Sequence, residues 1–238
     1  MITNYGEKKP GKSRFVIIAP HASGDDLKTG LLAKKIAEQV EGFFVINKNF
    51  IKPKNSNSKK HPEKIEDFNK LRWSRYNNKY IWKKKKPEMR DFFSDIDNFC
   101  NQAKKYSKEK KAVAIYIHGV KTTKIAIDLG AGLKRHNLGN KLFGTKKHKT
   151  KANNSGTITL QIGKIKKIKK YLEENLNQEV TIGEFYSGWS KSSAIQFHKQ
   201  EGRSDYALQF EINHLLRGSK KERIKIINLI SQTLIKYL

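Results

Sequence analysis

The chain has 238 residues, of which 37% are hydrophobic, so it is long enough to bury a sizeable core, and we expect residues 1–238 to form a single domain. Its net charge of +28 predicts an anionic partner, but the basic residues are 42 Lys and only 8 Arg, and nucleic-acid recognition favours the guanidinium fork of Arg. The apolar runs are too short to cross a membrane, the polar N-terminus has no apolar signal segment, and the lone Cys100 excludes an internal disulfide, so we expect a reduced, cytoplasmic protein without a membrane partner.

Five apolar segments predict strands, and they are rich in Val, Ile and Phe without strict alternation. They span residues 14–19, 43–46, 112–118, 180–184 and 206–213. Helical spacing of apolar residues appears in segments 26–40, 88–108, 158–175 and 220–238. Continuous apolar strands are typical of a sheet that is covered on both faces. The alternation of strands and helices therefore predicts an α/β fold with a mostly parallel, mixed sheet flanked by helices.

Two basic segments interrupt this pattern. Residues 52–86 are rich in Lys, Asn and Trp, and residues 141–156 are basic, polar and contain glycine. Neither segment has the periodicity of a core element, so we predict two long loops.

Two histidines stand where predicted strands end. The first strand leads into Pro20-His21 and is followed by Asp25-Asp26, and the central strand ends at His118. Ligands bind beyond the carboxyl ends of strands in open α/β sheets. Two imidazoles and one carboxylate are a typical protein ligand set for catalytic zinc, which keeps a fourth position open. Spacing alone allows either Asp25 or Asp26 as the carboxylate, and a turn histidine and a strand-end histidine without a metal are the alternatives.

Glu211 lies inside an otherwise apolar predicted strand. A buried carboxylate is costly unless it is paired or used in chemistry. An ion pair, for example with Arg217, is one interpretation. We favour a general base beside the metal, because Glu211 would face the same edge of the sheet as the histidines.

Three motifs of the chain together resemble a known group of enzymes. The first is the run 16–21, which ends in Pro20-His21, followed by Asp26 and by the segment 28–33. The second is Ile115-Tyr116-Ile117-His118-Gly119, and the third is the run 206–213 with its Gln-x-Glu pattern, followed by Leu215-Leu216-Arg217. In this order they are similar to the motifs of phage-type poly-γ-glutamate hydrolases and of N-formylglutamate amidohydrolases, and they span residues 14 to 217.

The resemblance implies a zinc carboxypeptidase-like sandwich that binds one Zn²⁺ ion. It implies that His21, Asp26 and His118 are the ligands and that Glu211 is the acid–base. The chain departs from the family at Asp26, where the family usually has Glu. It also replaces an Asp-x-Asn-Arg motif, which grips the substrate carboxylate, by Asp67-Phe68-Asn69-Lys70. We therefore expect Asn69, Lys70 and the nearby Arg72 to bind substrate. Residues 127–132 are expected to correspond to the family's glycine turn after the second histidine strand.

Two further residues are candidates for substrate binding. Arg217 would bind a substrate carboxylate or pair with an acidic residue, and His198 would stabilise an oxyanion or be an ordinary surface histidine. The predicted reaction is hydrolysis of an amide in a glutamate-like substrate, either a γ-linked polymer or an N-acyl or N-formyl glutamate. The alternatives are a basic nucleic-acid-binding protein and a member of the same fold that has lost catalysis. The sequence specifies no oligomeric state.

Overall fold

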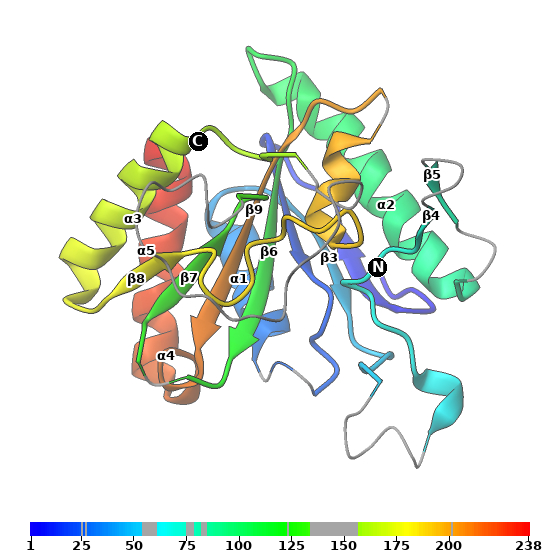
Figure 1. The fold of residues 1–238 in the computed structure, drawn as a ribbon, viewed down its shortest axis with the longest axis horizontal. Coiled ribbons are helices and arrows are strands. Elements are labelled where there is room, and N and C mark those ends of the chain that lie inside the picture. The colour runs from blue at the N-terminus through cyan, green and yellow to red at the C-terminus, as the bar shows by residue number, and fades with distance from the viewer. Residues whose placement is uncertain are drawn as a thin grey trace.

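The computed structural model describes residues 1–24, 26, 28–53, 61–74, 79–81, 85–122, 124–133, 157–200 and 202–238. Within these residues the main sheet has seven strands in the order β1-β3-β2-β6-β9-β7-β8. The strands are β1 (Gly6–Lys9), β2 (Phe15–Ala19), β3 (Phe43–Asn47), β6 (Val113–Val120), β7 (Ile127–Gly130), β8 (Val180–Ile182) and β9 (Tyr206–Asn213). All five predicted strands are present, and the sheet runs through the middle of the molecule (Figure 1).

The four central strands of the sheet are parallel to one another, and an antiparallel pair joins them to the strands on either side. Strands β3, β2, β6 and β9 are parallel neighbours. β1 is antiparallel to β3, and β7 is antiparallel to β9, with β8 parallel to β7. The prediction of a mostly parallel, mixed sheet is confirmed. The sequence did not predict β1 and β7. β7 occupies most of residues 127–132, which we expected as a glycine turn, because the backbone there is extended and pairs with β9.

Helices cover both faces of the sheet. α1 (Thr29–Gln39), α3 (Ile162–Leu176) and α5 (Lys220–Tyr237) bury their apolar residues in one core cluster. α2 (Pro87–Ala103) covers the opposite face through Met89, Phe92 and Ile96, which repeat at helical spacing. Figure 1 shows α3 and α5 on one side and α2 on the other.

α1 begins three residues later than predicted. Lys28 has a φ of 70°, in the left-handed region, and the helix cannot extend back through it. Asp26 instead belongs to the loop between β2 and α1. Its carbonyl oxygen accepts hydrogen bonds from the backbone N–H and the hydroxyl of Thr29, at 3.2 and 2.7 Å.

Short elements complete the fold. They are η2 (Pro62–Lys64), β4 (Trp73–Ser74), β5 (Lys79–Tyr80), η4 (Lys104–Tyr106), η7 (Ala194–Lys199) and α4 (His214–Gly218). Three of them, η2 and the antiparallel pair β4–β5, lie within residues 52–86, so the described part of that segment is not wholly loop. Phe68 and Leu71 of the same segment are buried in the α2-face core. The second predicted loop, residues 141–156, lies outside the described residues.

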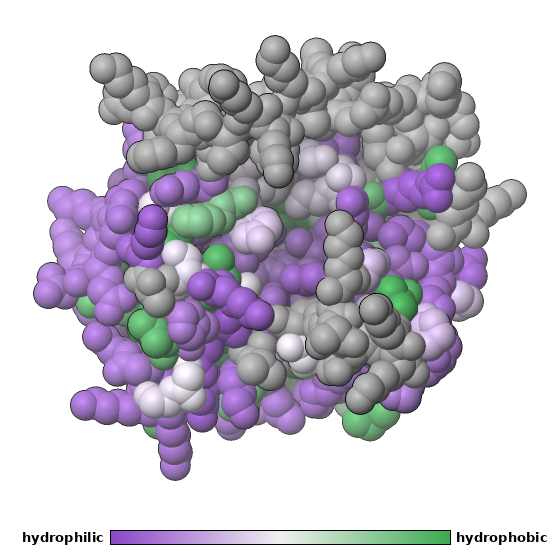
Figure 2. Space-filling model, turned by 60° about the horizontal axis from the view of Figure 1, so that its bottom comes forward, coloured by the Kyte–Doolittle hydropathy of each residue, from purple (hydrophilic) through white to green (hydrophobic). Residues whose placement is uncertain are grey.

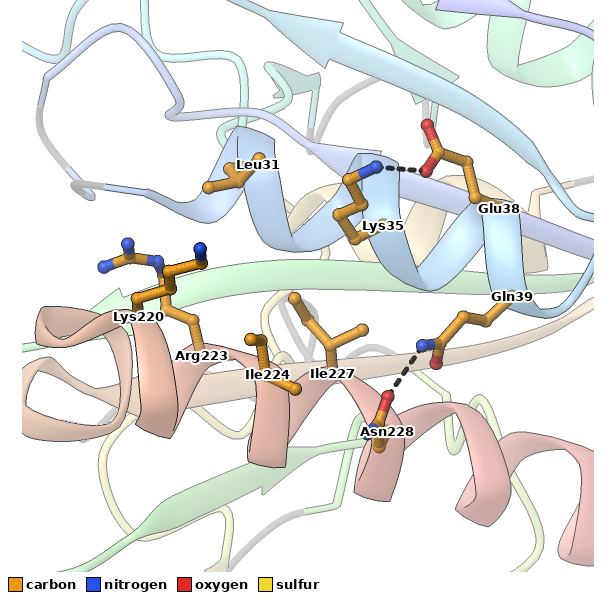
Figure 3. Close-up of a pocket in the computed structure, with 9 residues that line it drawn as sticks. All are labelled: Leu31, Lys35, Glu38, Gln39, Lys220, Arg223, Ile224, Ile227 and Asn228. Carbon is orange, nitrogen blue, oxygen red and sulfur yellow. Dashed lines mark hydrogen bonds and ion pairs between the residues drawn. The ribbon is translucent and has the colours of Figure 1, made fainter.

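A groove runs between α1 and α5 on the face away from α2. Leu31, Ile224 and Ile227 form its apolar floor, and the Gln39 side chain donates a hydrogen bond to Asn228 at one end (Figure 3). His21, Asp26 and His118 do not line this groove. Among the helices that the structure describes, none has the length and apolar composition needed to cross a membrane.

Candidate metal centre

The loop after β2 brings the first two ligand candidates together. The backbone N–H of Asp26 donates a hydrogen bond to the carbonyl of His21 at 3.2 Å, which closes the loop into a turn. Asn47 is buried and its side-chain amide donates to the carbonyl of Pro20 at 2.7 Å, which fixes the entry to the turn. A Cβ at Gly30 would lie 2.8 Å from the Cβ of Ala22, so only glycine lets α1 start this close to the turn. The turn and the start of α1 thus set the position of both His21 and Asp26.

His118 reaches the same place from the neighbouring strand β6. Asp26 Oδ2 lies 3.4 Å from His21 Nδ1 and 3.3 Å from His118 Nδ1, and all three residues are at most 4% exposed. Zinc bonds of about 2.0–2.1 Å in a tetrahedron separate neighbouring ligand atoms by about 3.3 Å. The two carboxylate–imidazole separations therefore match those around a single zinc ion, and one ligand atom from each of the three residues lies within 4.8 Å of the other two. Asp25, the other carboxylate that spacing allowed, lies outside the described residues.

The protonation states of this group suit a metal. Burial alone would raise the pKa of Asp26, but the neighbouring imidazoles of His118 and His21 outweigh burial and hold it well below its usual range. Burial lowers the pKa of His118 to about 4, with a smaller opposing effect from Asp26. At neutral pH the site thus offers an ionised carboxylate and a neutral imidazole, the forms that bind metal. The buried His21 Nδ1 and His118 Nε2 have no hydrogen-bond partner among the described residues.

Asp67 fixes the orientation of His21. Its Oδ1 lies 2.9 Å from His21 Nε2 and also accepts a hydrogen bond from the backbone N–H of Asn69 at 3.0 Å. The opposing effects of burial and of the His21 hydrogen bond leave the pKa of Asp67 lowered to about 2, so the carboxylate is ionised. It therefore accepts a hydrogen bond from Nε2–H, and in that tautomer the Nδ1 lone pair of His21 faces Asp26. This carboxylate–histidine pair is typical of zinc sites.

Replacing Asp67 by Asn is expected to weaken zinc binding, and replacing it by Ala to weaken it further. Asn keeps a hydrogen-bond acceptor but removes the charge, whereas Ala removes both, and such orienting partners typically contribute 10–100-fold, roughly, in metal affinity or activity. Competition with a zinc chelator measures the affinity. Equal affinity of the wild type and the Ala variant would contradict this role of Asp67. Glu63→Gln, at an exposed carboxylate in the same segment, is the matched control.

Glu211 lies beside the three ligands on the next strand. It is the register partner of His118 in the parallel pair β6–β9, so both side chains project from the same face of the sheet. Burial, and then the charge of Asp26, raises the pKa of Glu211 well above its usual range. Gln209 donates a hydrogen bond to Glu211 Oε1 at 2.5 Å. A buried carboxyl with a raised pKa next to a ligand set has the properties of a proton-transfer group.

Two cations lie near these carboxylates. Lys52 Nζ is 3.4 Å from Asp26 Oδ1, and Arg217 is buried at 5% exposure, with its Nε donating to the carbonyl of Ile212 at 3.0 Å. The charges of Asp26 and Glu211 both act on the Arg217 guanidinium, although burial, the larger effect, lowers its pKa. A Cβ at Gly119 would lie 2.4 Å from Arg217 Cζ, so the glycine after His118 leaves room for the guanidinium. The face at this edge of the sheet is mainly hydrophilic (Figure 2).

The other predicted substrate-binding residues are dispersed. Asn69 lies next to Asp67. Its Oδ1 is buried and has no hydrogen-bond partner among the described residues, whereas Lys70 and Arg72 are exposed further along the chain.

The structure corrects the prediction for His198. It is fully buried in the core under α2, where its Nε2 lies 2.9 Å from the hydroxyl of Tyr116, so it is neither a surface histidine nor in contact with the ligand group.

Sequence reasoning missed Asp67 as an orienting residue and Lys52 as a neighbour of Asp26. Asp67 lies in the Asp-Phe-Asn-Lys segment that the resemblance singled out, which is a signal that was available. Lys52 is one of 42 lysines, and the residues around it in the sequence do not distinguish it from the others.

Comparisons with known proteins relate this fold to solved structures alone: no family model and no curated protein matches the sequence. A bacteriophage poly-γ-glutamate hydrolase is similar with a TM-score of 0.54 at 12% identity, over 97% of this chain and 87% of that one. N-formylglutamate amidohydrolase from Ralstonia eutropha JMP134 has a TM-score of 0.54 at 12% identity, over 95% of this chain and 94% of that one. The zinc-free apo form of YndL has a TM-score of 0.51 at 11% identity, over 98% and 90%. These are the proteins that the sequence motifs resemble, and the chain shares their α/β fold over almost its whole length.

Proposed function

We propose that this protein is a zinc-dependent amidohydrolase that acts on an acidic, glutamate-like substrate. The observation that carries the proposal is the approach of His21 and His118 to Asp26, at separations that match those of neighbouring ligands around one zinc ion, with Glu211 on the adjacent strand. The names of the proteins with the same fold, a poly-γ-glutamate hydrolase and an N-formylglutamate amidohydrolase, support the reaction class. A cytoplasmic location stays a prediction.

Each residue has a distinct part in this reaction. His21, Asp26 and His118 would hold the ion, and Asp67 would keep the His21 lone pair directed at it. Bound zinc supplies a Lewis acid that polarises the scissile carbonyl and lowers the pKa of water. Glu211 takes a proton from the attacking water and delivers it to the leaving amine, and its raised pKa makes the carboxylate a stronger base than an exposed glutamate.

The charges around the centre support an acidic substrate. The guanidinium of Arg217 is held beside Gly119, where it can form a bidentate pair with a carboxylate. Lys52, next to Asp26, adds a second positive charge, and the chain as a whole carries +28. A carboxylate-bearing substrate would therefore be attracted to this edge of the sheet and anchored at Arg217.

Two assays with zinc-loaded protein test the proposal. Shortening of poly-γ-glutamate, followed by gel filtration, reports the polymer activity, and release of formate from N-formylglutamate reports the small-substrate activity. We expect turnover in one of them, its loss on chelation, and its return when zinc is added back. Zinc-loaded protein that turns over neither substrate would contradict the substrate assignment.

A further inference from the structure

We propose that the chain binds a second metal ion, in a buried site formed by Cys100, His198 and Asp205. This group lies in the core between α2 and the sheet, apart from the centre formed by His21, Asp26 and His118. One ligand atom from each of the three residues lies within 4.8 Å of the other two. All three side chains are at most 1% exposed. The ion would be zinc or a similar thiolate-binding divalent metal, with a structural role.

The three donors come from separate elements. Cys100 is on α2, His198 is on η7, and Asp205 immediately precedes β9. Cys100 Sγ lies 3.9 Å from His198 Nδ1. A tetrahedral zinc ion with bonds of about 2.3 Å to sulfur and 2.0–2.1 Å to nitrogen would separate these atoms by about 3.6 Å. A shift of a few tenths of an ångström therefore converts the present contact into a ligand pair.

Tyr116 sets His198 in the form that binds metal through Nδ1. The Tyr116 hydroxyl donates to the carbonyl of Ala194 at 3.4 Å, and its oxygen, 2.9 Å from His198 Nε2, accepts a hydrogen bond from Nε2–H in the tautomer that has its lone pair on Nδ1. The lone pair of Nδ1 then faces the sulfur. A metal-bound histidine typically donates its other N–H to an oxygen in this way.

Asp205 is held in place by two partners and keeps further acceptor capacity. Its Oδ1 accepts from the backbone N–H of Ala112 at 3.0 Å, and its Oδ2 lies 3.5 Å from Lys104 Nζ. One carboxylate oxygen of Asp205 lies within 4.8 Å of Cys100 Sγ. Among the described residues, the hydrogen-bond contact of the thiol is the weak one with His198, at 3.9 Å. A bound ion would neutralise the charges of the thiolate and the carboxylate, and it would link α2 to the start of β9.

Cobalt substitution tests this site separately from the first. A cobalt ion bound by thiolate has an intense sulfur-to-metal charge-transfer band in the near ultraviolet, whereas histidine and carboxylate ligands have none. The chain has a single cysteine, so such a band can only come from Cys100. We expect the band in the cobalt-loaded wild type, its persistence in His118→Ala, and its loss in Cys100→Ser. We also expect Cys100→Ser to bind one equivalent of metal less than the wild type and to keep the wild-type hydrolysis.

A cobalt-loaded wild type that lacks the band would overturn the proposal, and so would an equal metal content in the wild type and Cys100→Ser. The wild-type spectrum decides the question even where Cys100→Ser fails to fold. Asp205→Asn is expected to shift the band because the carboxylate is lost, whereas Asp97→Asn, at a partly exposed carboxylate on α2, leaves it unchanged.

Discussion

Replacing Glu211 by Gln is expected to leave zinc bound and to reduce kcat/KM for amide hydrolysis by about 10²-fold or more, because general acid–base catalysis contributes on that scale. Glu211 is not among the three ligand residues, so metal content should be unchanged. Gln retains an oxygen that accepts the hydrogen bond from Gln209, and it avoids burying a charge, so the fold should be kept. The measurement combines steady-state kinetics with metal analysis of the same preparation.

The matched control for this change is Glu174→Gln. Glu174 lies on the solvent side of α3, with a side chain that is 57% exposed, and it pairs only distantly with Lys170, at 3.8 Å. The same chemical change there should leave kcat/KM and metal content at their wild-type values. Retained turnover in Glu211→Gln would remove the catalytic role of Glu211. A wild type that binds zinc and has no activity, equal to the variant, would instead indicate a binding protein that has lost catalysis.

Replacing His21 or His118 by Ala is expected to remove the zinc of the first centre and to abolish hydrolysis. Each imidazole would supply one of the three protein ligands, and among the described residues the group that could hold this ion consists of His21, Asp26 and His118. The loss of affinity should exceed the effect of roughly 10–100-fold expected for an orienting residue such as Asp67. Metal analysis after dialysis, with circular dichroism to verify folding, measures the result.

His61→Ala is the control for the histidine variants. The His61 side chain is 60% exposed and its Nδ1 lies 3.3 Å from the exposed carboxylate of Glu63, so its removal should change neither metal content nor activity. Zinc that stays fully bound in both His21→Ala and His118→Ala would contradict the proposed zinc centre. Steeply salt-dependent binding of DNA or RNA that persists after chelation would then favour the alternative in which the positive surface is the functional part.

The sequence alone determined the centre of the fold. Strands β2, β6 and β9 are continuous apolar runs, and such runs can be recognised from local composition because both faces of a central strand are buried. Their ends supply His21, His118 and Glu211, and parallel strands carry such residues to one edge of the sheet. The fold class was therefore predictable, as was the arrival of these residues at one edge of the sheet, and their roles in metal binding and catalysis stay predictions.

Only the tertiary structure decided the contacts between segments that lack periodicity. Asp67 and Lys52 approach His21 and Asp26 because the segment after β3 folds back over the carboxyl end of the sheet, and a polar loop has no repeating pattern that reports its partner. β7 forms because β9 offers an unpaired edge, a condition set by the strand order. His198 is buried because Tyr116 satisfies its ring nitrogen, and a hydrogen bond between residues 82 positions apart leaves no trace in the local sequence.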